Sequence, residues 1–441
     1  MAEEISNLRE DIINESFIKE ILKEKYGDNV KFLSYTASVG SEKGDNYVGD
    51  LVAIDVKVKC VDNNEEKTMY WMCKATKRGK CEKGVQEFTL FERELAFYTT
   101  FLEDLEKYVK PKILRTVPLI YSVNKPDLQT LVFKNLGAED YEDPKNKRFG
   151  LDDDHVLKVC KWLAELHGSA HVLFQKYPGG FTEWKKNNFF SETIQSDNFD
   201  KYTDAMLNGF YNLLEDLRNG SENDSTIQCF ETSLKDFFEE RPNDISIPVK
   251  MKMALYDSRS EFKTLCHGDP WFNNMLFKYD NDGIVKDVIL LDMQLVYSGN
   301  IGSDLASFLL SSVTYDALVK NLDMYLEYYR ECLISFVADL DPDTPVSLTI
   351  EDIKMDFKKS SLLGFIFASR AFPHTLIDKK DASTIDLKNF DLTNMEDVNK
   401  LMVETRAHGK KVLHNDINLY SRMFGVIRFL TELKIFDSLK N

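Results

Sequence analysis

The chain has 441 residues, a length that favours two lobes or domains over a single core. Its net charge is −17, from 56 basic and 73 acidic residues, so it is a poor candidate for binding nucleic acid or an anionic membrane, which both reward basic surfaces. The first residues lack an apolar signal sequence, no stretch is apolar over the length of a membrane span, and the seven cysteines show no CxxC pair. We therefore expect a cytoplasmic protein with reduced thiols and no obligate protein partner.

The amino-terminal part of the sequence predicts a short helix followed by an antiparallel sheet. The helix is expected from Ser16 to Tyr26. The apolar alternation of half-buried strands then occurs at 30–35, 47–60 and 67–75, and two further strands are expected at 119–123 and 131–134. We assign residues 1–134 to this first lobe and residues 135–441 to a second, mainly helical lobe.

The loop between the first two strands, residues 37–46, is a candidate phosphate-binding loop. A glycine-containing hairpin loop can bind phosphate through its backbone N–H groups, and the residues in question are Gly40, Gly44 and Asn46. The loop lacks a G-x-G-x-x-G pattern, so an ordinary turn is the alternative interpretation.

Lys74 lies near the end of the third strand, and Met72 shares its face because side chains alternate along a strand. Lys77 and Lys80 are alternatives to Lys74 as a functional cation.

A helix expected from Gln86 to Leu105 carries an apolar stripe that should lie on the sheet. Glu94 sits beside that stripe and can reach Lys74. Glu87, one heptad earlier on the same face, is the alternative partner, and a solvated Glu94 is the other interpretation.

The second lobe should be mainly helical. Helices are expected at about 152–171, at several places between 177 and 260, and at 315–340, 350–372, 398–408 and 417–436. His167 lies on the apolar face of the first of these and is interpreted as a core or interlobe histidine. The segment 177–260 carries aromatic residues that can line an apolar pocket, although core packing is the commoner role: Phe189, Phe190, Phe210, Tyr211, Phe237 and Phe238.

The clearest chemical signal lies between residues 264 and 308. His267-Gly268-Asp269 follows an apolar lead-in, and Asn274 comes five residues after the aspartate, in a loop rich in Gly, Pro and Asn. A turn and a buried strand, Val288–Leu291, then end at Asp292. Phosphoryl transfer needs an aspartate to orient or accept the acceptor's proton, and hard oxygen ligands for magnesium, so Asp269 is the candidate for the first task and Asn274 with Asp292 for the second.

These motifs carry a family resemblance. H-G-D-x-W-x-x-N-x-L-F from His267, L-D-x-Q from Leu291 and the following Asp304-Leu305 resemble the aminoglycoside phosphotransferase and choline kinase superfamily, and within it the insect ecdysteroid kinase-like family. Pro270 and Phe272 stand where that family usually has Leu and Val. Met293 stands where the metal loop usually has an aromatic residue, and methionine fills a similar volume.

The resemblance implies an α+β, protein-kinase-like fold of two lobes that binds ATP and magnesium. Lys74 would pair with the phosphates, Glu94 would fix Lys74, and Met72 would pack on adenine. The remaining contacts to ATP are expected from the loop and from the connection between the lobes, at Gly40, Gly44, Asn46, Phe133 and Asn135. Asp304 would support the catalytic loop, with helix capping as its alternative role.

Three functions remain open on the sequence alone. Only eleven residues separate Asp292 from Asp304, which leaves no room for the activation segment of a protein kinase and favours a small-molecule acceptor. The resemblance favours an ATP- and magnesium-dependent kinase that phosphorylates a hydroxyl of an ecdysteroid or related steroid. The alternatives are a kinase for choline, ethanolamine or another dietary or xenobiotic hydroxyl compound, and a catalytically silent ligand-binding protein.

Overall fold

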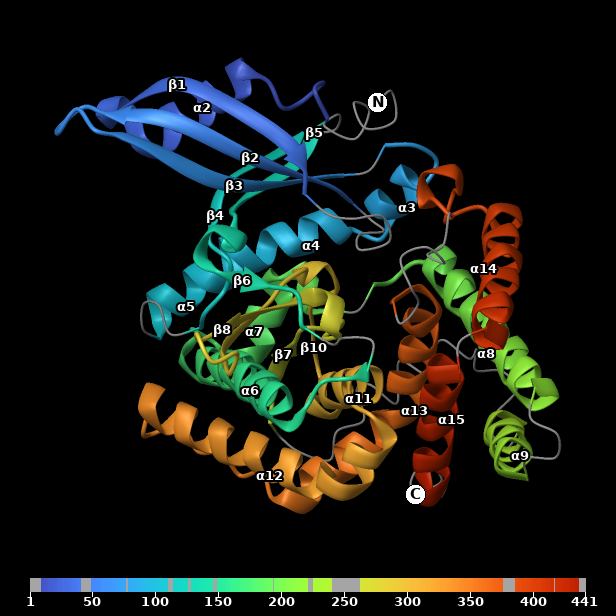
Figure 1. Ribbon diagram of the computed structural model, residues 1–441. Helices are drawn as coiled ribbons and strands as arrows, with labels where there is room; N and C mark the ends of the chain where they lie inside the picture. The colour runs from blue at the N-terminus through green and yellow to red at the C-terminus, as the bar shows by residue number, and fades with distance from the viewer. Residues whose placement is uncertain are drawn as a thin grey trace.

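A β-sheet lies at one end of the molecule, and helices make up most of the rest (Figure 1). This computed structural model describes the segments 9–40, 49–76, 78–109, 114–125, 128–145, 149–192, 194–220, 225–239, 262–375, 385–415 and 417–435. The predicted class, an antiparallel sheet followed by a mainly helical part, is confirmed. The sheet's last strand ends at Lys134, the residue at which the sequence analysis divides the chain.

The amino-terminal sheet is antiparallel, with its five strands in the order β1-β2-β3-β5-β4. Alternate residues of β2 are fully buried, Ile54 and Val56 among them, which explains why the alternating pattern predicts the strand. Helix α2 (Glu15–Tyr26) packs its apolar face into the same cluster. The strands are β1 (Val30–Val39), β2 (Gly49–Cys60), β3 (Glu66–Thr76), β4 (Leu119–Lys125) and β5 (Leu128–Lys134).

The helix predicted from Gln86 to Leu105 is confirmed from Leu90 onward, but its continuation through the first turn is wrong. The structure breaks it at Thr89, whose φ of +54° lies in the left-handed region. That conformation is uncommon for a β-branched residue, and the apolar stripe continues through it, so periodicity gives no sign of the break. The resulting pieces are α3 (Glu82–Glu87), α4 (Leu90–Ala96), a π-helical turn (Phe97–Phe101) and α5 (Leu102–Tyr108).

The main core of the helical part is built on α6 (Asp153–Lys176), α11 (Ile301–Ser312), α12 (Tyr315–Leu340) and α13 (Ile350–Thr375). Asp152 caps α6 as predicted, since its side chain accepts a hydrogen bond from the His155 N–H at 3.1 Å. Helices α11 and α13 approach closely because glycines face the partner backbone. A Cβ at Gly302 would lie 2.2 Å from the Asp356 carbonyl, and one at Gly364 would lie 2.8 Å from the Ala306 carbonyl carbon.

Short strands complete the second part. The pair β7 (Thr264–Cys266) and β10 (Tyr297–Gly299) is antiparallel, and β6 (Tyr141–Glu142), β8 (Met275–Tyr279) and β9 (Val285–Leu290) form a three-stranded sheet. Helix α7 (Gly180–Asn187) lies in the middle of the molecule (Figure 1). The remaining helices lie to one side of it: α8 (Asp197–Gly220), α9 (Ser225–Glu239), α14 (Met395–Asn415) and α15 (Ile417–Glu432). Among the described residues, no helix combines the length and apolar character needed to cross a membrane.

The aromatic residues predicted between 177 and 260 divide into two groups. Phe190 is buried against Trp184, with ring centroids 5.5 Å apart, as core packing predicts. Phe189 is 52% exposed and contributes little to that core. The side chains of Phe210, Tyr211, Phe237 and Phe238 lie outside the described part of the structure.

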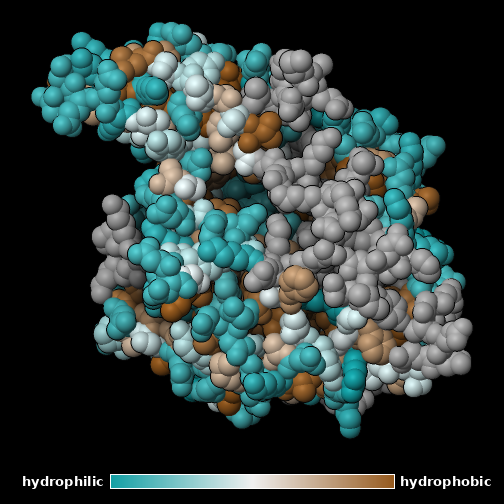
Figure 2. Space-filling model, viewed as in Figure 1, coloured by the Kyte–Doolittle hydropathy of each residue, from teal (hydrophilic) through white to brown (hydrophobic). Residues whose placement is uncertain are grey.

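A segment near the carboxyl terminus also contacts the first part of the chain. Lys80 donates its backbone N–H to the Lys388 carbonyl at 2.8 Å, and Leu392 packs on Gly84 of α3. In Figure 1 the start of α14 accordingly lies near α3. The surface is hollowed beneath the sheet, and the residues visible in that hollow are hydrophilic (Figure 2).

Candidate active site

The catalytic-loop motif begins where β7 ends, and its glycine is required by the fold. Gly268 has φ of +85°, in the left-handed region, and a Cβ at this position would lie 2.1 Å from the Leu295 carbonyl oxygen. Only glycine is compatible with both the positive φ and the close approach of the Leu295 carbonyl. The loop carrying Asp269 therefore lies directly against the segment that follows Asp292.

Asp269 and Asn274 are hydrogen-bonded to each other. The amide Nδ2 of Asn274 donates to Oδ2 of Asp269 at 3.1 Å and to the Asp269 carbonyl at 3.0 Å. Because the amide nitrogen of Asn274 donates these hydrogen bonds, the amide oxygen is the atom that can bind a metal ion. Asn274 is 9% exposed and sits at the end of a short 3-10 turn, Phe272–Asn274.

The hairpin β8–β9 brings Asp292 back beside Asn274. Met275 pairs with Leu290 in its register, and Leu291 N–H donates to the Asn274 carbonyl at 2.9 Å. Asp292 then adopts φ of +68°, an uncommon conformation for a residue other than glycine. Its Oδ2 accepts a hydrogen bond from Gln294 Nε2 at 3.1 Å. The two loops are thus held together by backbone pairing.

Lys74 joins the sheet to this hairpin. Its Nζ lies 2.5 Å from Oε2 of Glu94 and 2.6 Å from Oδ1 of Asp292, so one cation serves two carboxylates. Burial alone would lower the pKa of Lys74, but Asp292 and then Glu94 raise it above its usual value. Lys74 is therefore positively charged at neutral pH.

Glu94 lies on α4, is only 3% exposed and also accepts a hydrogen bond from the Met293 backbone N–H. Burial raises the pKa of Glu94 to about 7, with a contribution from repulsion by Asp292, while Lys74 opposes the shift. Of the two glutamates considered for this role, Glu94 contacts Lys74. Glu87 instead accepts hydrogen bonds from Ser196 and Asn198.

Of the two alternatives to Lys74, the structure describes Lys80. Lys80 pairs with Asp397 at 3.0 Å and lies on the surface. Lys77 lies outside the described residues.

Asp304 holds the backbone of the catalytic loop from below. It accepts hydrogen bonds from the N–H groups of His267 at 2.7 Å and Gly268 at 3.0 Å. Burial alone would raise the pKa of Asp304, but a hydrogen bond from His167 and the charges and donors around it lower the pKa below its usual value. The alternative role, helix capping, belongs to Asn300, whose Oδ1 accepts a hydrogen bond from the Gly302 N–H at 2.7 Å.

His267 links the two loops as a neutral ring. Burial lowers the pKa of His267. The partners assign the proton to Nε2, which donates to the Leu291 carbonyl at 3.0 Å, while Nδ1 accepts from the Asp269 N–H at 3.3 Å. His267 therefore supports Asp269 without needing to act on a substrate.

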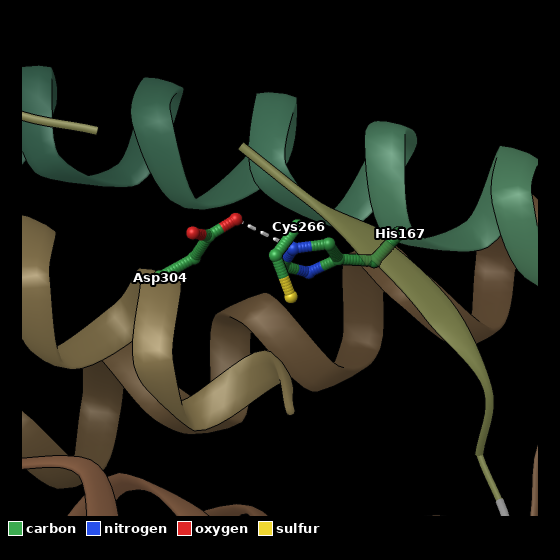
Figure 3. Close-up of side chains that lie close together, drawn as sticks. All are labelled: His167, Cys266 and Asp304. Carbon is green, nitrogen blue, oxygen red and sulfur yellow. Dashed lines mark hydrogen bonds and ion pairs between the residues drawn. The ribbon is translucent and has the colours of Figure 1, made fainter. Parts of the chain in front are cut away.

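His167, Cys266 and Asp304 form a buried cluster beneath the loop, with their nearest polar atoms within 4.8 Å of one another (Figure 3). His167 uses both ring nitrogens, one 3.0 Å from Asp304 and one 2.7 Å from the Tyr329 hydroxyl. Burial raises the pKa of Cys266, which therefore stays a thiol, and its Sγ donates to the Asn300 carbonyl at 3.5 Å. Since these groups satisfy one another and the loop, the cluster is a hydrogen-bonded support rather than a metal site.

Of the residues predicted to contact adenine and phosphates, Gly40 and Phe133 lie next to Met72. Met72 pairs with Phe133 across β3 and β5, and a Cβ at Gly40 would lie 2.6 Å from its sulfur atom. These three residues are therefore neighbours on the sheet. Gly44 and Asn46 lie outside the described residues.

Asn135 begins the connection that leaves the sheet. Its N–H donates to the Tyr70 carbonyl at 2.9 Å, and its side chain accepts from the Gly137 N–H at 3.0 Å. Phe133 is buried against Tyr98, with ring centroids 5.0 Å apart. Both residues have structural tasks here, and their contact with adenine stays a prediction.

Arg93 has a role in the site that was not predicted from the sequence. This arginine is 4% exposed and donates to the carbonyls of Phe190, Glu192 and Val296 at 2.6 to 3.3 Å. It ties the helix of Glu94 both to the segment 189–192 and to the chain that follows Asp292. An arginine on a helix normally predicts a solvent-exposed side chain, so the sequence carries no signal of this role.

The fold is protein-kinase-like, and a lysine on the antiparallel sheet with its glutamate partner lies close to an H-G-D loop, an asparagine and a second aspartate, the set of groups found in kinase-like phosphotransferases. The sequence model of the ecdysteroid kinase-like family matches residues 43–341, and the chain belongs to this family. Kinase-like proteins of this kind generally use ATP and Mg²⁺.

Two further comparisons add little. Among curated proteins, none matches the chain. Among solved structures, an ethanolamine kinase from Plasmodium vivax is similar over 91% of this chain and 89% of its own, with 10% sequence identity and a TM-score of 0.39. A similarity this distant carries no inference about the substrate of this chain.

Proposed function

We propose that this protein transfers the γ-phosphate of ATP, with Mg²⁺, to a hydroxyl group of a small molecule, and that this acceptor is an ecdysteroid or a related steroid. The observation that carries the proposal is the convergence of Lys74, Glu94 and Asp292 opposite the hydrogen-bonded pair of Asp269 and Asn274. A non-enzyme has no need of the whole set.

In this proposal Asp269 orients the acceptor hydroxyl and takes its proton as the new bond to phosphorus forms. The bond between the γ-phosphorus and the bridging oxygen breaks, and ADP leaves with that oxygen. Little covalent chemistry falls to the protein in such a transfer, so positioning and charge compensation account for most of the catalysis. The hydrogen bonds that fix Asp269 to Asn274 and His267 serve that positioning.

The residues present fit a magnesium ion. Asp292 and Asn274 offer a carboxylate and an amide oxygen, the hard ligands that Mg²⁺ prefers, and backbone pairing holds them side by side. Asp292 already has a cationic neighbour in Lys74 at 2.6 Å. When bound, the ion would neutralise charge on the phosphates, and Lys74, held by Glu94, would bind the same phosphates.

Family membership supports the steroid acceptor, and the surroundings of Asp269 are consistent with it. Trp271 and Leu295, which flank the H-G-D loop, are apolar and only partly buried. A flat apolar ring system would cover such side chains. We further propose that the protein acts in the cytoplasm on this small molecule alone, without a nucleic-acid, membrane or protein partner.

A second candidate is a kinase for choline, ethanolamine or a similar hydroxylated amine. The observation that favours it is the aromatic side chain of Trp271 beside the Asp269 carboxylate, because a cation is attracted both to an indole face and to a carboxylate. Under this alternative the catalytic residues keep their roles and only the acceptor changes.

The test is magnesium-dependent transfer of labelled γ-phosphate from ATP to a panel of ecdysteroids, amino alcohols and plant phenolics. The matched control is Asp269→Asn, which keeps the shape of the side chain and removes its charge. Transfer to one steroid hydroxyl that is lost in the variant is the expected result.

Transfer to an amino alcohol alone would establish the second candidate. An unchanged rate in Asp269→Asn would reject the assigned role of this residue. Tight ATP binding without transfer to any acceptor in the panel would count against both candidates and in favour of a silent binding protein.

A further inference from the structure

The indole of Trp271 donates a hydrogen bond to the proposed catalytic aspartate. Its Nε1 lies 3.2 Å from Oδ2 of Asp269, the same oxygen that accepts from Asn274 Nδ2 at 3.1 Å. Two donors from different residues therefore converge on one carboxylate oxygen. Indole is a donor only, so this bond does not depend on an assigned proton position.

The local backbone directs the indole to that oxygen. Trp271 N–H donates to the Asp269 carbonyl at 3.1 Å, which closes a three-residue turn around Pro270. Proline favours such a turn because its ring fixes φ. The next turn is closed by Asn274 N–H, which donates to the Trp271 carbonyl at 2.8 Å. Asp269, Trp271 and Asn274 are thus parts of one folded loop.

Among the described residues, the indole ring is anchored by Phe272. It packs on Phe272, with ring centroids 5.7 Å apart, and Phe272 is completely buried. Trp271 itself is only partly buried. Its position is therefore set by Phe272, the turn and the bond to Asp269.

We infer that Trp271 is a positioning residue for phosphoryl transfer, whose indole N–H fixes the Asp269 carboxylate. The inference rests on the proposed function. With Oδ2 held by two donors, the carboxylate cannot rotate freely, so its orientation toward the acceptor hydroxyl is fixed. A misdirected base lowers the rate of the chemical step even when both substrates are bound.

The chain contains a matched control for this bond. Trp184 donates from its indole Nε1 to Oδ2 of Asp104 at 3.0 Å, the same chemical pair, in the core between α5 and α7. If Trp271 had only a structural role, removing its indole N–H would have the same kind of effect as removing that of Trp184. Both changes would lower stability, and neither would lower kcat.

The first experiment observes the bond without any substrate. The protein has four tryptophans, so ¹⁵N labelling of tryptophan should give four indole N–H signals by NMR. Trp271→Phe assigns the Trp271 signal by its disappearance, and Trp184→Phe assigns that of Trp184. Asp269→Ala should move the Trp271 signal upfield and leave the Trp184 signal in place. A Trp271 signal that ignores the loss of Asp269 would overturn the inference.

The second experiment measures catalysis. Trp271→Phe should lower kcat by about 10- to 100-fold with little change in the KM for ATP, because a displaced base affects the chemical step. Replacing Trp271 with 3-benzothienylalanine, which keeps the ring shape and exchanges the N–H for sulfur, should cause the same loss. Trp184→Phe should lower the unfolding temperature and keep kcat.

Full kcat in the benzothienyl variant would show that the ring and not its N–H matters, and would overturn the inference. A loss confined to the KM of the acceptor would do the same, since it would make Trp271 a binding surface. Absence of phosphate transfer by the wild-type protein would instead count against the proposed function, and the NMR result would still decide whether Trp271 holds Asp269.

Discussion

The pKa values of two buried carboxylates in the site are shifted in opposite directions. Asp304, beneath the catalytic loop, is 1% exposed, and Glu94, beside the sheet, is 3% exposed. The pKa of Asp304 nevertheless lies below its usual value, although burial alone would raise it, whereas burial raises the pKa of Glu94 to about 7. Burial alone therefore does not set the charge of either group.

The difference lies in the partners of each carboxylate. Asp304 accepts hydrogen bonds from two backbone N–H groups and from His167, and among the described residues none of these donors is shared with another carboxylate. Glu94 depends on Lys74, which it shares with Asp292. A carboxylate with several donors of its own stays charged and can fix a loop, while one that shares its cation keeps a charge that depends on its neighbours.

Removing Asp304 should have the largest effect on stability. Asp304→Ala deletes the acceptor of three hydrogen bonds and leaves buried donors without partners. We expect a loss of about 3–5 kcal/mol in the free energy of unfolding, measured by urea denaturation. A loss below 1 kcal/mol would contradict the idea that this carboxylate fixes the loop.

Gly268→Ala should be the next most damaging change, because it combines positive φ with an overlap of the Leu295 carbonyl. The expected cost is about 2–3 kcal/mol, together with loss of phosphate transfer, since Asp269 must shift. Gly283→Ala is the control: this glycine also has positive φ, but a Cβ there would meet no atom within 4 Å. Equal effects of the two substitutions would mean that φ alone, and not the close approach of the two loops, matters.

The pH dependence of stability should separate the two carboxylates. Between its ordinary pKa of 4.5 and about 7, Glu94 binds a proton in the folded state that the unfolded chain has released. The free energy of unfolding should therefore fall as pH rises through this window, by the slope of at most one proton, and Glu94→Gln should remove that slope. Glu87→Gln, in the neighbouring helix, should leave it.

For Asp304 the sign is reversed. Its lowered pKa stabilises the fold above the ordinary value of 3.8, and this contribution is lost as pH falls below that value. Glu94→Gln could instead remove the pH dependence of the free energy of unfolding below pH 4 and leave it between pH 4.5 and 7. That result would contradict the raised pKa of Glu94.

Tyr329→Phe should have the smallest effect. The Tyr329 hydroxyl is hydrogen-bonded to His167, and His167 is hydrogen-bonded to Asp304. Two residues therefore lie between this hydroxyl and the catalytic loop. We expect a loss of about 1 kcal/mol in stability and nearly full kcat. A large fall in kcat at unchanged stability would contradict this expectation. It would show that the position of the catalytic loop depends on the Tyr329 hydroxyl as well as on Asp304.

Local patterns predicted much of the fold. The three first strands and the helix Tyr315–Leu340 appear as expected, because each buries one continuous face that periodicity records. The motif residues Asp269, Asn274 and Asp292 were selected by their chemistry, and the structure brings them together with Lys74 and Glu94. Their roles stay predictions until a reaction is measured.

Other features depend on contacts between distant parts of the chain and left no local signal. Thr89 breaks a helix whose apolar stripe is continuous. Arg93 is buried because three carbonyls from residues 190, 192 and 296 surround it. Trp271 was visible as part of a motif, but its bond to Asp269 follows from the turn around Pro270.

The most direct test of the account is the turnover of Asp292→Ala with ATP, Mg²⁺ and the acceptor that the wild-type protein phosphorylates. The substitution leaves Lys74 paired with Glu94 alone, so the fold should remain and the unfolding transition should be nearly unchanged. Phosphate transfer should be lost while the protein stays folded. Transfer at the wild-type rate would contradict the assignment of Asp292 and, with it, the proposed arrangement of the site.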